Sequence, residues 1–113
     1  MTPSTHLNPC LKKLLVEKVQ QIPGVSHKPW PERDDGFSTL HFQDREIGHF
    51  HNFNEIDLRL GRKLIKRERL EHYPDSTNHP NRSVNSVFIE RRFADTDEVE
   101  DIVRLIKLAA ESA

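Results

Sequence analysis

The pattern of apolar and polar positions predicts helices near the two ends of the chain. Residues 11–22 carry apolar side chains at helical spacing, after an Asn8-Pro9 pair that is typical of a helix start. Residues 99–110 carry a second apolar stripe, and Asp95 or Thr96 is the expected N-cap of that helix. Each helix therefore has one apolar side with which to cover a sheet.

The middle of the chain has the alternation of β-strands. Three stretches, residues 37–42, 47–51 and 55–60, alternate or cluster apolar residues as strands do, and a fourth follows at about residues 86–92. A short basic helix is expected at residues 62–70. The predicted order is α-β-β-β-α-β-α. This is an α+β fold, with an antiparallel sheet of about four strands and helices mainly on one face.

The register of the second predicted strand decides where its two histidines point. His49 and His51 are two residues apart, so a strand directs both to the same face. If Asp44-Arg45 forms the preceding turn, His49 lies opposite Leu40 and shares its face. A shift of one residue would move both histidines to the other face, and the sequence leaves this open.

Composition favours one soluble domain. A length of 113 residues suits a single core, which we expect over residues 8–113 after a disordered segment at residues 1–7. Residues 25–36, rich in Pro and Gly, are expected to form an extended loop. Short apolar runs such as Leu14-Leu15-Val16 are far from the length of a membrane span, and a single cysteine excludes an internal disulfide. We therefore expect a cytoplasmic protein.

Charge gives no indication of a macromolecular partner. Lys and Arg number 17 and Asp and Glu 18, so the net charge is −1. This balance favours neither nucleic acid nor an anionic membrane. We expect a small-molecule ligand of unknown identity, and the oligomeric state is left open.

Candidate chemistry concentrates in residues 48–60. An imidazole of His49 or His51 can transfer protons at neutral pH, Asp57 can orient it, and Arg59 can hold an anionic ligand. The opposite interpretation is that the histidines are packed and hydrogen-bonded for structural reasons.

A metal site is a second alternative for the same segment. His49, His51 and Glu55 form a His-x-His-x-x-x-Glu string that is similar to the first metal motif of cupins. Such a site would still require a further ligand such as His79 or Asp57, and the second cupin motif is absent from the sequence. The sequence also lacks a Gly-rich phosphate loop, and we predict no cofactor.

The polar stretch from Asp75 to Ser83 is a second candidate region. It is long for a connection and has no apolar residue apart from Pro80. Asp75, His79 and Arg82 can either hydrogen-bond a ligand or pin the loop to the sheet.

Five strings in order resemble the small bacterial proteins of the luciferase-domain family. They lie at residues 22–25, 33–37, 47–51, 55–60 and 75–83, and the resemblance covers about residues 20–110. It implies a distant relation to the small luciferases of luminous fungi, which oxidise a polyphenolic pyrone with oxygen. It further implies a cofactor-free oxygenase or acid/base catalyst with a histidine as base. The competing class is a non-catalytic interaction domain.

Overall fold

The computed structural model describes residues 9–73, 75 and 86–111. The elements follow the order α1 (Pro9–Val19), β1 (Val25–Pro29), β2 (Ser38–Phe42), β3 (Arg45–Phe50), β4 (Glu55–Arg59), α2 (Arg62–Arg67), β5 (Phe88–Arg92) and α3 (Thr96–Glu111). Residues 1–7, expected to be disordered, and the expected cap Asn8 lie outside the described residues. Among the described helices, none is long and apolar enough to cross a membrane.

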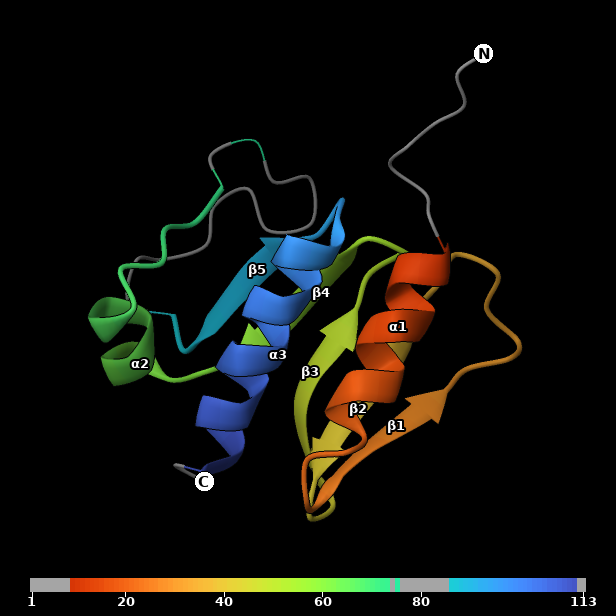
Figure 1. Cartoon of the computed structure of the whole chain (residues 1–113), viewed down its shortest axis with the longest axis horizontal. Coiled ribbons are helices and arrows are strands. Elements are labelled where there is room, and N and C mark those ends of the chain that lie inside the picture. Colours follow the sequence, from red (N-terminus) through yellow and green to blue (C-terminus); the bar gives the residue numbers. More distant parts are fainter. Residues whose placement is uncertain (1–8, 74, 76–85, 112–113) are drawn as a thin grey trace.

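The strands form one antiparallel sheet in the order β1-β2-β3-β4-β5. Helices α1 and α3 lie side by side against one face of this sheet (Figure 1). The face that points away from α1 and α3 is called the open face below, a name that means only that these two helices do not cover it. The predicted α+β class, the antiparallel sheet and the placement of the helices are confirmed, with five strands where about four were expected.

The core fills the space between the two helices and the sheet. Alternate residues of β2, β3, β4 and β5 point toward the helices and are almost fully buried: Leu40, Phe50, Ile56, Leu58 and Ile89. The helices contribute Leu15 and Val19 from α1 and Val99, Ile102, Leu105 and Ile106 from α3. This single cluster accounts for the apolar stripes in the sequence.

The additional strand is β1, where the sequence predicted only an extended loop. Val25–Pro29 pairs with β2, so the prediction is wrong for these residues. A strand at the edge of a sheet buries little, and in β1 only Val25 is fully buried. Pro29 ends the strand, where a missing N–H is tolerated.

The helix boundaries also differ from the expected ones. Helix α1 ends at Val19 and α2 at Arg67, each a few residues early. The N-cap of α3 is Asp95, whose Oδ1 accepts a hydrogen bond from the backbone N–H of Glu98 at 2.8 Å. Of the two residues expected to cap this helix, Asp95 is therefore the cap and Thr96 is the first helical residue.

The register between β2 and β3 differs from the one that an Asp44-Arg45 turn gives. The two-residue loop is Gln43-Asp44, and both residues have positive φ (49° and 72°), as a type I′ turn requires. A β-bulge between Leu40 and His41 then shifts the pairing once more. His49 therefore lies opposite Thr39 and not Leu40, which answers the question of register that the sequence left open.

Candidate functional site

A row of polar residues crosses the open face of the sheet. Thr39, His49, Asp57 and Glu90 are consecutive partners on β2, β3, β4 and β5. Three of them are buried, with Thr39 and Glu90 at 3% exposed and Asp57 at 1%. Burying polar groups costs free energy unless they are hydrogen-bonded, so packing alone does not explain this row.

The structure brings together the three residues predicted to be catalytic. His49 Nε2 lies 3.7 Å from Asp57 Oδ2. The ring of His51 stands edge-on to that of His49, with 4.8 Å between centroids. One nitrogen or oxygen from each of the three side chains lies within 4.8 Å of the others. His49, His51 and Asp57 are called the His/Asp cluster below.

Glu46 orients His49, and sequence reasoning missed it. Its Oε2 lies 2.9 Å from His49 Nδ1. An ionised carboxylate can only accept, so with Glu46 ionised Nδ1 donates this hydrogen bond, and Nε2 is the nitrogen on the side of Asp57. Residues three apart on a regular strand point to opposite faces; the irregular register near Leu40 and His41 brings Glu46 and His49 to one face.

Aromatic rings surround the His/Asp cluster. The ring centroids of Phe37 and Phe88 lie 5.9 Å and 6.3 Å from that of His49. Trp30 packs edge-on to Phe37 at 5.6 Å, and its Nε1–H donates to Thr39 Oγ1 at 3.3 Å. Trp30, Phe37 and Phe88 give the open face an apolar wall on which a planar organic ligand can pack.

A small pocket adjoins the cluster where β3 and β4 diverge. Their pairing extends only from Phe50 and Ile56 to Gly48 and Leu58. The pocket encloses about 180 Å³ and is lined by Phe42, Arg45, Glu46, Ile47, Arg59, Leu60, Gly61, Val87 and Ala109. It is called the notch below.

The notch joins the cluster through two of its lining residues. Glu46 bonds His49, and Arg59 lies two positions after Asp57 on the same face of β4. With Arg45, the lining of the notch includes two arginines and one glutamate. This charge favours an anionic group.

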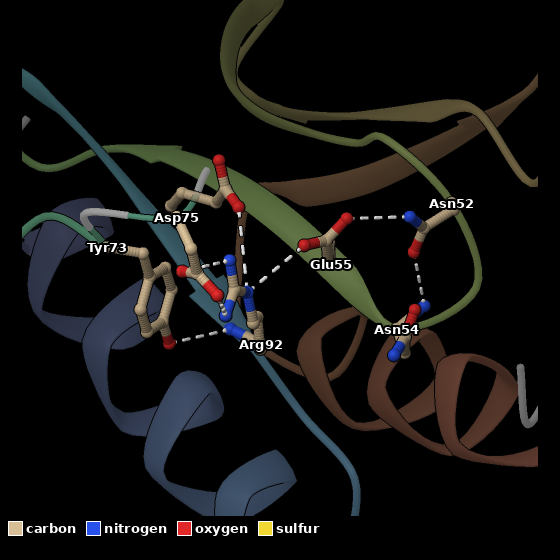
Figure 2. A network of polar contacts seen from close by, with 7 residues as sticks. Asn52, Asn54, Glu55, Tyr73, Asp75 and Arg92 are labelled. Atoms are coloured by element: carbon tan, nitrogen blue, oxygen red, sulfur yellow. Dashed lines mark hydrogen bonds and ion pairs between the residues drawn. The ribbon is translucent and has the colours of Figure 1, made fainter. Parts of the chain in front are cut away.

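Glu55, the third residue of the predicted metal set, is engaged elsewhere. Its Oε1 accepts from Asn52 Nδ2 at 2.7 Å, and its Oε2 accepts from Arg92 Nε at 3.2 Å, as Figure 2 shows. In the described part of the chain, the group of side chains suited to a metal contains Asp57 in place of Glu55.

Asp75 is also held by Arg92. Its two oxygens accept from Nη1 and Nη2 at 3.4 Å and 3.0 Å (Figure 2). These hydrogen bonds lower the pKa of Asp75 and raise that of Arg92. The guanidinium stacks 4.1 Å above the ring of Tyr73, whose Oη accepts from the Arg92 backbone N–H. These contacts are those expected if Asp75 pins its loop; His79 and Arg82 lie outside the described residues.

The sequence matches one known protein family. The family model of the luciferase domain matches residues 44–109, which include the His/Asp cluster and most of the residues lining the notch. The chain therefore belongs to the luciferase domain family. No curated protein and no solved structure matches the chain.

Proposed function

We propose that this luciferase-domain protein binds a small organic anion at the notch, next to the open face of its sheet. The observation that carries the proposal is the notch, which is lined by two arginines; one of them, Arg59, lies 5.9 Å from the ring centroid of Phe88 in the aromatic wall. A volume of about 180 Å³ is below the range of about 300–1,000 Å³ that is usual for drug-sized ligands. The notch therefore suits one anionic end of a ligand whose planar part packs on Phe37 and Phe88.

The His/Asp cluster is the reacting centre in this proposal. A ligand with its anionic end near Arg59 would extend along β4 toward Asp57 and His49. Side chains that transfer protons must lie within hydrogen-bonding reach of the ligand, and the side chain of His49 is partly exposed.

A second candidate function is metal-free acid/base chemistry or cofactor-free oxygenation by His49. The hydrogen bond from Nδ1 to Glu46 favours it, because a carboxylate behind an imidazole fixes the tautomer of a general base. In this case Nε2 would take a proton from an acidic ligand hydroxyl, and Asp57 would stabilise the imidazolium that results.

Binding of benzoate and of its neutral counterpart benzamide tests the proposed ligand class. We expect benzoate to shift the NMR amide signals of Glu46 and Gly61 saturably, and benzamide to bind at least about tenfold more weakly because it lacks the charge. Arg59→Gln and Arg45→Gln should weaken benzoate binding. Lys107→Gln, an exposed change on α3, should not.

Two results would contradict the proposal. Equal binding of benzoate and benzamide would show that the arginines do not select an anion. No saturable shift at the notch with either probe would favour the interaction-domain alternative.

A further inference from the structure

We propose that His49, His51 and Asp57 bind one divalent transition-metal ion. The inference rests on the proposed function only in treating the His/Asp cluster as the reacting centre. Metal binding is measured without any organic ligand, so either proposal can fail while the other stands.

The donor atoms are of the right kind and close enough. Two imidazoles and one carboxylate are a set that suits iron, zinc, nickel or manganese, whereas calcium and magnesium prefer oxygen alone. The three donors lie within 4.8 Å of one another, and a tetrahedral ion with bonds of about 2.0–2.1 Å holds its ligands about 3.4 Å apart. The donor atoms must therefore approach one another by up to about 1.4 Å, which rotation of the side chains can provide.

The two strands supply the donors from fixed positions. His49 and Asp57 are direct partners on β3 and β4, and His51 is the first residue after β3. The backbone N–H of His51 donates to the carbonyl of Glu55 at 3.0 Å, which continues the pairing to that residue. A sheet positions metal ligands more rigidly than a loop does.

Glu46 provides an independent indication of a metal ligand. A metal-binding histidine commonly donates its second ring N–H to a carboxylate, which fixes the tautomer and raises the basicity of the ligating nitrogen. Glu46 is placed in this way behind His49, at 2.9 Å from Nδ1, while Nε2 is the nitrogen on the side of Asp57. The same ring thus has one nitrogen bound and the other directed into the cluster.

Burial indicates where the ion would lie. Asp57 is 1% exposed and forms the floor of the cluster, whereas His49 is 20% exposed and faces solvent. Three protein ligands leave coordination positions open, and here they would face the aromatic wall. The bound ion would use the lone pair of Nε2, so it would replace proton transfer at that atom with Lewis-acid chemistry.

Titration of the chelator-treated protein with Co²⁺ and with Zn²⁺ tests the inference. We expect one ion per chain, and for Co²⁺ the visible absorption of a site with nitrogen ligands. His49→Gln, His51→Gln and Asp57→Asn should each weaken binding at least about tenfold, and Glu46→Gln should weaken it by about 10–100-fold.

The matched control is His41→Gln. His41 is another histidine of this sheet, and its Nε2 is bonded to Thr39 Oγ1 at 3.1 Å. The control should bind Co²⁺ as the parent does. Replacement of the buried Asp57 can prevent folding, so the two histidine variants alone are sufficient for the test.

Two results would overturn the inference. One is the absence of stoichiometric binding of either ion. The other is binding that His49→Gln and His51→Gln leave unchanged, which would place the ion elsewhere. With either result, benzoate binding at the notch would still decide the proposed function.

Discussion

At the scale of single residues, Arg92 has the most partners among the charged side chains discussed for the open face, because it contacts at least three other side chains. It bonds Glu55 of β4 and Asp75, which lies between α2 and β5 in the chain, and it stacks on Tyr73. Glu55 is 16% exposed, whereas Asp75 is 73% exposed. Glu55, the more buried partner, should therefore carry most of the stabilisation, because solvent screens the pair between Arg92 and Asp75.

Replacing Arg92 tests this division. Arg92→Met should lower the free energy of unfolding by about 1–3 kcal/mol, because Glu55 loses the cation beside it. Asp75→Asn should cost much less. Urea denaturation of both variants measures the difference, and equal losses would contradict this account.

His27 makes stability depend on pH. It lies on the helix side of the sheet, where its Nε2 is bonded to Ser38 Oγ at 2.8 Å. Burial, and secondarily the charge of Lys12, lower its pKa from the ordinary value of 6.5. The unfolded chain therefore takes up a proton near pH 6.5 that the folded chain takes up only at lower pH. Stability should be fully present above that value and fall as the pH drops through the lowered pKa.

A His27→Gln variant isolates this effect. Between about pH 7.5 and about pH 5, the parent should lose more stability than the variant does, because only the parent carries this titration. Urea denaturation at both pH values measures the two losses. If the parent and the variant lose stability in parallel, the lowered pKa of His27 is not the cause.

At the scale of secondary-structure elements, the close approach of β3 and β4 sets the position of the cluster. Gly48 permits this approach, since a Cβ there would lie 2.9 Å from the carbonyl oxygen of Asp57 and 3.0 Å from a methyl of Leu58. The pair Gly48↔Leu58 is adjacent to the pair His49↔Asp57.

Gly48→Ala should therefore separate the two strands beside the cluster. We expect a loss of about 1–3 kcal/mol in the free energy of unfolding and weaker Co²⁺ binding. Ser26→Ala, an exposed change on the edge strand β1, should stay within about 0.5 kcal/mol of the parent. Wild-type stability and metal affinity in Gly48→Ala would show that the strands do not need this approach.

The elements also show where sequence patterns stop being informative. The apolar stripe of α3 and the alternation in β4 predicted both elements, because each has one buried side. Strand β1 escaped prediction because an edge strand buries so little. The register of β3 could not be predicted because Gln43 and Asp44 both adopt positive φ, although neither is a glycine that would indicate such a turn.

At the scale of the whole molecule, the two faces of the sheet have different roles. The face under α1 and α3 holds the apolar core, and the open face holds the buried polar row and the aromatic wall. Segment 48–60 alone indicated His49, His51 and Asp57 as candidates. Glu46, Phe37 and Phe88 could not be found from the sequence, because a bulge, a loop and a strand far along the chain bring them to the cluster.

The most direct test of the open face as a functional site is the stability of His49→Gln and His51→Gln in metal-free buffer. Residues kept for function are often retained at the expense of stability. We predict that urea denaturation will find both variants within about 0.5 kcal/mol of the parent or more stable. Leu40→Ala, in the core, should lose about 2–5 kcal/mol in the same assay and serves as the reference. A loss of about 2 kcal/mol or more in both histidine variants would mark these residues as structural and contradict the account.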